Sequence, residues 1–248
     1  MIPIGDDNSD RRTRPYVTWA LIAANAIVFI LLQGFGTNAR FTYAFSTVPS
    51  EILSGRDLVT PDRVVVDPST GERAVVPGLG RTPLSVYITL LVSMFLHGGI
   101  AHILGNMLYL FIFGDNVEDR LGHVRFLLFY LFCGVAASLA HVFATKLTGG
   151  NLGVPSLGAS GAISGVLGAY LMLFPRRRVR VLLFRFITNV PAVVVVGAWF
   201  LFQVVNGLGM LGGGTGGGVA YAAHVGGFIV GFLTVRLWAA GRGSSSSR

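Results

Sequence analysis

The sequence has few charged residues. Only 12% of its 248 residues are charged, while 52% are hydrophobic, and a soluble domain typically carries about 25% charged residues. A chain with so little charge cannot cover its surface against water. The composition therefore predicts a membrane protein that crosses the lipid bilayer several times.

Cysteine and lysine are nearly absent, with one of each, Cys133 and Lys146. A single cysteine excludes a disulfide framework and a cysteine-based metal cluster. The other 18 basic residues are arginines that are scattered along the chain, so the net charge of +8 does not indicate a nucleic-acid-binding stripe. Basic residues precede the first apolar run, but no small-residue cleavage site follows it, and we expect no cleavable signal peptide.

Acidic residues are absent after Asp119, and none of the eleven lies inside an apolar run. This excludes a di-aspartyl intramembrane protease and disfavours a proton-coupled carrier, since both need carboxylates at membrane depth. A zinc protease of the H-E-x-x-H type needs a glutamate beside its histidines, and the closest pair, His97 and His102, has none. The sequence shows no third ligand beside this histidine pair.

Six apolar segments approach the roughly 20 residues that a helix needs to cross a bilayer. They lie at residues 17–35, 100–113, 126–144, 159–174, 190–208 and 219–238. The second and fourth are short, which is typical of helices that line a functional cavity. The sequence predicts an all-α membrane protein in which residues 16–238 form a six-helix bundle.

The arginines predict the orientation. With the N-terminus inside, inner segments hold 13 of the 19 basic residues, and five of the six outer ones lie in one long loop, where the bias is weak. Residues 1–15 and the tail, residues 239–248, are therefore expected to be cytoplasmic, and the Gly/Ser-rich end of the tail is expected to be disordered. The long outer loop, residues 36–96, contains two valine-rich stretches that predict a hairpin near residues 62–77.

Hydroxyl, amide and imidazole groups remain to carry chemistry in the second half of the chain. Ser160 begins the fourth segment and His224 lies within the sixth. Alone, such a serine is more often an N-cap, and such a histidine is more often a hydrogen-bonded core residue. Together they favour a nucleophile and its base, because free N–H groups at a helix start can hold an oxyanion. Without a nearby carboxylate, the pair would be a dyad rather than a triad.

Small residues recur at helical spacing on the fourth and sixth segments. Ser160, Ser164 and Gly168 share one face of the fourth segment. Small residues let two helix backbones approach closely, which is what bringing Ser160 to His224 requires. The residues to which we assign this packing role are Gly158, Gly161, Gly165, Gly227 and Gly231.

His102 and Asn106 lie four residues apart on one face of the second segment. Both side chains can donate hydrogen bonds to an oxyanion, and both can equally serve as polar contacts between helices. The two interpretations stay open at this point. Gln203 and Asn206 in the fifth segment are interpreted as structural contacts.

Three motifs occur in a fixed order along the chain: His97-Gly-Gly-Ile-Ala-His-Ile-Leu-Gly-Asn-Met107, Gly158-Ala-Ser-Gly161 and His224-Val-Gly-Gly-Phe-Ile-Val-Gly231. Together they resemble the bacterial rhomboid intramembrane serine proteases over nearly all of residues 16–238. The resemblance implies Ser160 as nucleophile and His224 as general base and acid. It also implies an oxyanion hole made by the Ser160 amide with His102 and Asn106.

The same resemblance implies a multi-pass protein of the cell membrane whose site opens to the outer side. It implies single-span membrane-protein substrates, cut near a small residue, with the fifth helix and the loop before the sixth as gate and cap. No metal, cofactor or nucleic acid is implied, and the sequence predicts no oligomeric state.

Two departures from the family pattern bear on the site. Ser164 stands where some members carry an aromatic residue that stacks on the catalytic histidine, so the group that orients His224 is left open. A Trp-Arg pair of the first outer loop is also missing. The alternatives are an inactive rhomboid-like protein that binds membrane clients and, less favoured, a small channel or transporter.

Overall fold

The chain folds as a helical bundle around the short helix α7 (Ser160–Leu173). The computed structural model describes residues 1–66, 71, 73–211 and 221–240. Three helices in these ranges are long and apolar enough to cross a membrane, namely α5 (Ile100–Leu121), α6 (His123–Leu147) and α9 (Tyr221–Ala239). Shorter apolar helices span Tyr16–Leu32, Val86–Phe95, Ser160–Leu173 and Ala192–Leu208.

The apolar segments of the sequence are thus largely helical, and three of them meet the length that defines a candidate span. The first apolar helix consists of α1 (Tyr16–Ile27) continued by a π-helical turn, and the fifth segment forms α8 (Ala192–Leu211). Between α1 and α5 lie the short helices α2 (Ala39–Ala44), α3 (Pro49–Ser54) and α4 (Thr89–Val92).

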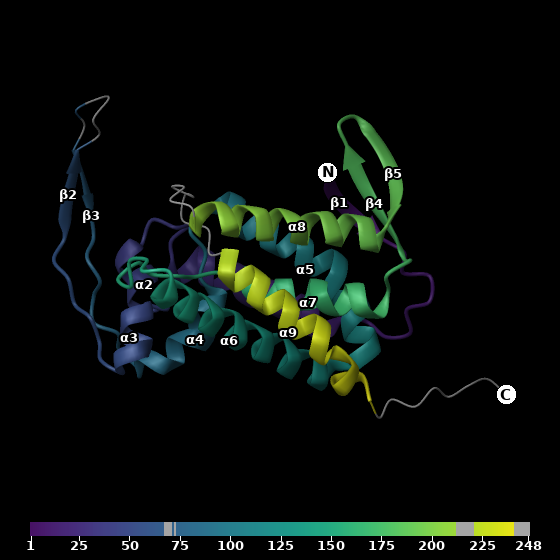
Figure 1. Cartoon of the computed structure of the whole chain (residues 1–248), viewed down its shortest axis with the longest axis horizontal. Coiled ribbons are helices and arrows are strands. Elements are labelled where there is room, and N and C mark those ends of the chain that lie inside the picture. Colours follow the sequence, from purple (N-terminus) through teal and green to yellow (C-terminus); the bar gives the residue numbers. More distant parts are fainter. Residues whose placement is uncertain (67–70, 72, 212–220, 241–248) are drawn as a thin grey trace.

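Helix α7 is surrounded by other helices, because every residue from 161 to 170 is buried. It contacts α5, α6, α8 and α9 (Figure 1). Its small residues permit this. An added methyl group on Gly165 would overlap the Cys133 side chain of α6, and one on Gly168 would overlap the Phe228 carbonyl oxygen of α9. A helix enclosed in this way does not need the length of a lipid-facing span.

Helices α7 and α9 pack backbone to backbone. A methyl group on Gly227 would overlap the carbonyl oxygen of Gly161, and one on Gly231 would overlap that of Gly165. Only glycine leaves room for this approach. The close contact holds the start of α7 beside the first turn of α9, where Ser160 and His224 lie.

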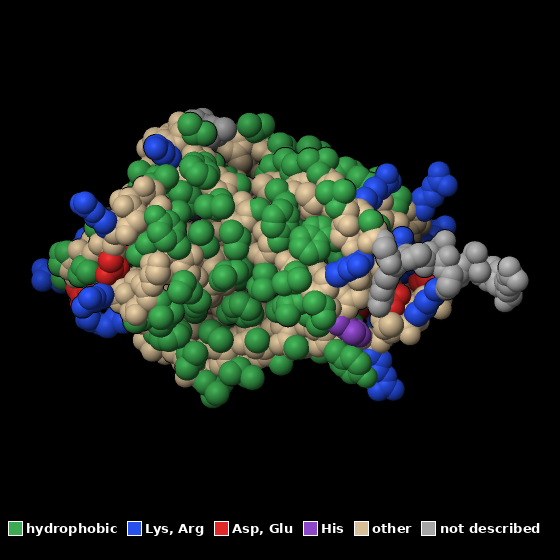
Figure 2. Space-filling model, turned by 90° about the horizontal axis from the view of Figure 1, so that it is seen from below, with side chains coloured by type: hydrophobic (Ala, Val, Ile, Leu, Met, Phe, Trp, Pro, Cys, Tyr) green, Lys and Arg blue, Asp and Glu red, His purple; other side chains and the backbone are tan. Residues whose placement is uncertain are grey.

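The surface of the bundle is largely apolar. Figure 2 shows hydrophobic side chains across the middle of the molecule, with most Lys, Arg, Asp and Glu side chains toward its two ends. Exposed apolar residues include Leu104 and Phe111 of α5, Leu201 of α8 and Leu233 of α9. A continuous apolar surface of this extent is a membrane-contact surface rather than a water-facing one.

A three-stranded antiparallel sheet was not predicted from the sequence. The strands β4 (Arg178–Leu183) and β5 (Phe186–Pro191) form a hairpin between α7 and α8, and β1 (Ile2–Asp6) pairs with β4. In β4, the buried Val179 and Val181 alternate with exposed arginines, which is the period of a strand with one covered face. The expectation of an all-α chain overlooked this alternation within the arginine cluster.

The strands β2 (Arg63–Val66) and β3 (Arg73–Val76) pair antiparallel, with Arg63 opposite Val76. All residues of β2 are exposed, and the hairpin stands away from the bundle, at the opposite end from the β1–β4–β5 sheet (Figure 1). Most of the predicted turn between the strands, at 67–70, and the end of the tail, at 241–248, lie outside the described residues.

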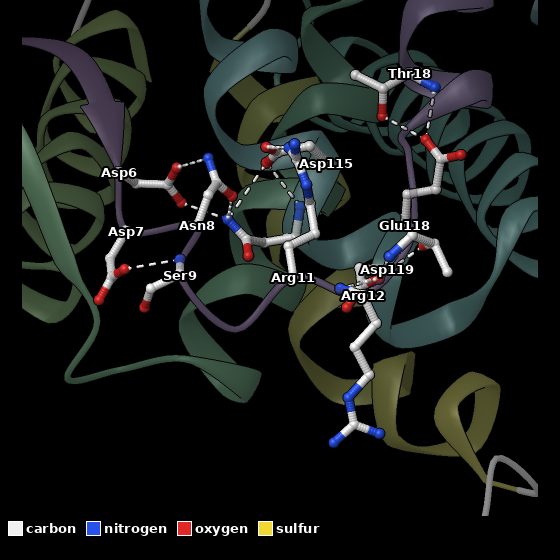
Figure 3. Close-up of polar contacts among 12 residues, drawn as sticks. Asp6, Asp7, Asn8, Ser9, Arg11, Arg12, Thr18, Asp115, Glu118 and Asp119 are labelled. Atoms are coloured by element: carbon white, nitrogen blue, oxygen red, sulfur yellow. Dashed lines mark hydrogen bonds and ion pairs between the residues drawn. The ribbon is translucent and has the colours of Figure 1, made fainter.

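The N-terminal segment is fastened to the end of α5 by acidic side chains (Figure 3). The Asp119 carboxylate accepts hydrogen bonds from the backbone N–H groups of Arg12 and Thr13, at 3.1 and 2.7 Å. The Glu118 carboxylate accepts two from Thr18, both at 2.7 Å, from its backbone N–H and its hydroxyl. These contacts join parts of the chain that are about 100 residues apart, so they fix the N-terminal segment against the bundle.

Asp6, at the end of β1, makes the docking of this segment sensitive to pH. It accepts hydrogen bonds from Tyr170 Oη at 2.6 Å and from Asn116 Nδ2 at 2.7 Å. Burial raises the pKa of Asp6 from 3.8 to about 7, with a smaller contribution from the nearby Asp115 charge. The folded state therefore binds a proton that the unfolded state releases, and the stability of the docked segment falls as the pH rises from about 4 to about 7.

We expect limited proteolysis of residues 1–15 to be slow at pH 5 and faster at pH 8. Asp6→Asn cannot titrate and should remove this dependence, so the ratio of wild-type to variant cleavage rates corrects for the pH response of the added protease. The same pH dependence in both proteins would contradict the assignment to Asp6.

Candidate functional site

Ser160 is the first residue of α7 and is half-buried, so its hydroxyl remains reachable. The chain reaches it through Gly158, whose φ of +124° lies in the region that favours glycine. The Gly158 N–H donates to the Ser93 carbonyl oxygen at 2.9 Å, which anchors the loop. The N–H groups in the first turn of a helix have no acceptor within that helix. The serine hydroxyl therefore lies beside donors that are free to bind an anion.

His224 of α9 lies directly against this serine. Its Nε2 is 2.7 Å from Ser160 Oγ, and its Nδ1 is 2.8 Å from Gln203 Oε1 of α8. A neutral imidazole has one donor and one acceptor nitrogen. With the Gln203 carbonyl oxygen facing Nδ1, the proton is assigned to Nδ1, and Nε2 accepts a hydrogen bond from the serine hydroxyl. This is the arrangement of a nucleophile and its base.

The aromatic contacts of the His224 ring come from α8 and α9. The Trp199 ring of α8 is tilted by 37° at a centroid distance of 6.1 Å, and Tyr221 meets the imidazole edge-on at 6.4 Å. Ser164 takes no part in holding the ring, since its hydroxyl donates to the Ser160 carbonyl oxygen at 2.6 Å. The sequence left open which group orients His224, and in the structure α8 contacts its ring through Trp199 and Gln203.

His102 and Asn106 lie on the part of α5 that faces the serine loop. The His102 ring packs against Gly158, because a methyl group there would lie 2.9 Å from His102 Nε2 and 3.7 Å from Ser160 Oγ. Asn106 is buried, and its Nδ2 is 2.9 Å from His97 Nε2. The His102 ring and the Ser160 hydroxyl thus both border the space beside the Gly158 Cα. The Asn106 side chain is held by His97.

His97 supports the site, although its only signal in the sequence is its place in a motif. The Gln33 side chain accepts from the His97 N–H and donates to the His97 carbonyl oxygen, both at 2.9 Å. His97, Gln33 and Asn106 are all buried. Gln203 is the second residue that supports the site without having been assigned to it from the sequence. We had interpreted its amide as a structural contact, whereas in the structure it contacts the His224 ring. The contacts of His97 and Gln203 cannot be deduced from helical spacing, because spacing does not show which helices face each other.

The other polar residues singled out in the sequence lie elsewhere. The Asn206 side chain donates to the Phe202 carbonyl oxygen of its own helix at 2.7 Å. The loop before α9, at 212–220, lies outside the described residues. Within the described ranges, no three His, Cys, Asp or Glu side chains come together in a way that could hold a metal ion.

Comparisons with known proteins give one consistent family. Residues 85–240 match the family described as Rhomboid domain. The chain is 32% identical over 222 residues to "Rhomboid protease GluP" of Bacillus subtilis, which covers 89% of this chain and 34% of that protein. It is 37% identical over 147 residues to "Rhomboid protein 1, mitochondrial" of Saccharomyces cerevisiae, covering 59% of this chain and 40% of that one.

A plant relative, "RHOMBOID-like protein 4" of Arabidopsis thaliana, is 35% identical over 144 residues, or 58% of this chain and 32% of the relative. The aligned part of each of these three relatives is between 32% and 40% of its own length. The part that matches the family, residues 85–240, contains both Ser160 and His224.

Proposed function

Because the chain belongs to the rhomboid family, we propose that it is an intramembrane serine endopeptidase that cuts transmembrane segments of membrane-protein substrates with a Ser160–His224 dyad. The observation that carries this proposal is the 2.7 Å contact between Ser160 Oγ and His224 Nε2. The similarity to the relative named "Rhomboid protease GluP" supports it. The presence of both dyad residues disfavours the alternative of an inactive family member.

In the proposed mechanism, each step of hydrolysis is carried out by a named residue. Ser160 Oγ attacks the carbonyl carbon of the scissile bond while His224 Nε2 takes its proton. The resulting oxyanion is held by the Ser160 N–H, His102 and Asn106, which are hydrogen-bond donors. The protonated His224 then gives its proton to the leaving amine, and an acyl-enzyme on Ser160 remains. Water, deprotonated by His224, releases the second product and restores the serine.

The proposal includes six membrane-spanning helices, formed by α1 with its π-helical turn, α5, α6, α7, α8 and α9, with both termini cytoplasmic. The docking of residues 1–18 against the C-terminal end of α5 is consistent with this orientation, because it keeps the N-terminus and the turn after α5 on one side of the bundle. With both termini cytoplasmic, the start of α7, with Ser160, would face the outer side. Substrates would be single-span proteins of the cell membrane, because one transmembrane helix can reach a site enclosed between α5, α8 and α9.

The direct test is cleavage in liposomes. The purified chain is reconstituted with a single-span substrate, and the products are mapped by mass spectrometry. The proposal predicts a cut within or at the edge of the substrate's transmembrane segment. Binding of the substrate without any cut would favour the inactive client-binding alternative. Ion or solute flux in the absence of cleavage would favour a channel or transporter.

Replacement of His102 or Asn106 by alanine tests the oxyanion hole. We expect either substitution to lower kcat by about 10²-fold, as loss of one oxyanion donor does in serine proteases. The thermal unfolding midpoint should change much less than the rate. A variant with undiminished kcat would return that residue to the role of a polar contact between helices.

A further inference from the structure

The His224 base has an amide where a serine-protease triad has a carboxylate. Gln203 Oε1 lies 2.8 Å from His224 Nδ1, and Gln203 is only 5% exposed. Every acidic residue of the chain lies at or before Asp119, and within the described residues the side-chain hydrogen bonds of His224 go to Gln203 and Ser160. We propose that Gln203 is the positioning residue that fixes the productive tautomer of His224, a role that rests on the proposed function.

The chemical reason lies in the two nitrogens of the ring. Nε2 must be free of a proton to accept one from Ser160, so Nδ1 must carry the proton. A carbonyl oxygen facing Nδ1 stabilises this tautomer, and it also accepts the Nδ1–H when the ring becomes charged. The wrong tautomer at this position costs a serine protease about 10⁴-fold in kcat. An amide can perform the carboxylate's orienting role without itself titrating.

The position of Gln203 makes the orientation of the His224 ring depend on helix α8. Gln203 and Trp199 are four residues apart on α8, and both contact the His224 ring. The opposite face of α8 carries exposed apolar side chains, including Leu201 and Val205. The orientation of His224 therefore depends on how α8 packs against α9, and a displaced α8 would leave Ser160 with an unoriented base.

The experiment compares Gln203→Leu, Gln203→Glu and the control Asn206→Leu. The control removes from the same helix an amide that donates to the Phe202 carbonyl oxygen, one turn earlier. Gln203→Leu should lower kcat by about 10²-fold, the cost of a misplaced catalytic group, with little change in KM. Asn206→Leu should keep the wild-type kcat. Gln203→Glu should retain activity, and the acidic limb of its pH–rate profile should move to higher pH, because a carboxylate stabilises the charged imidazole.

Three results would overturn the proposal. The first is full kcat in a folded Gln203→Leu variant. The second is an equal loss of kcat in Asn206→Leu, and the third is an unshifted acidic limb in Gln203→Glu, which decides the matter if Gln203→Leu does not fold. Failure of the proposed function can be distinguished from failure of the Gln203 proposal. If the protein is not a serine protease, the wild type itself would show no cleavage that depends on Ser160.

Discussion

Replacement of Ser160 by alanine is expected to abolish substrate cleavage in liposomes, lowering kcat by about 10⁴-fold or more. The reason is that the variant keeps His224 and the oxyanion donors but has no group to form the acyl-enzyme. In a soluble serine protease, loss of the nucleophile costs about 10⁶-fold. Cleavage is measured by the appearance of product bands under single-turnover conditions, with protein stability followed in parallel.

Ser164→Ala is the matched control for this prediction. Ser164 is one turn further along α7, is buried and donates to the Ser160 carbonyl oxygen. Its loss removes a hydroxyl from the same helix without removing the nucleophile, so kcat should fall by less than about 10-fold. Comparable activity of Ser160→Ala and wild type, or a greater loss in Ser164→Ala, would remove Ser160 from the reaction.

Replacement of Gly227 by alanine is expected to have the largest effect on stability. The added methyl group would overlap the Gly161 carbonyl oxygen, and the backbone atoms of two closely packed helices cannot move aside cheaply. Overpacking of this kind costs about 3 kcal/mol of unfolding free energy. Because the same contact brings α9 to α7, the variant should also lose activity. Unfolding in mixed micelles measures the first effect and liposome cleavage the second.

Gly197→Ala on α8 is the control, since a methyl group there has no neighbouring atom within 4 Å. Alanine is the better helix former by about 0.5–1 kcal/mol, so this variant should be as stable as the wild type or slightly more so. Equal unfolding free energies for Gly227→Ala and Gly197→Ala would show that α7 and α9 are not held by their glycine contact.

Much of the bundle could be predicted because its signals are local. Apolar runs indicate helices, and glycines at helical spacing indicate the faces on which helices meet closely. The spacing of small residues around Ser160 and His224 thus predicted that α7 and α9 would be neighbours. Helix length was less informative for α7, because a helix buried among others need not match the thickness of a bilayer.

The parts that were not predicted depend on which elements meet in space. The β1–β4–β5 sheet joins residues 2–6 to residues 178–191, and the valine alternation of β4 is partly hidden by its arginines. Gln203 was identified in the sequence, but only the packing of α8 against α9 brings its amide to His224. His97 and Gln33 likewise meet across 64 residues, a separation that no local pattern indicates.

Labelling with a fluorophosphonate probe tests the central claim most directly, because this reagent attaches covalently to an activated serine. The intact protein is treated in liposomes and the labelled peptide is mapped. The dyad predicts a single labelled residue, Ser160, with labelling strongly reduced in His224→Ala. A label on a different serine, or equal labelling in Ser160→Ala and wild type, would contradict the account.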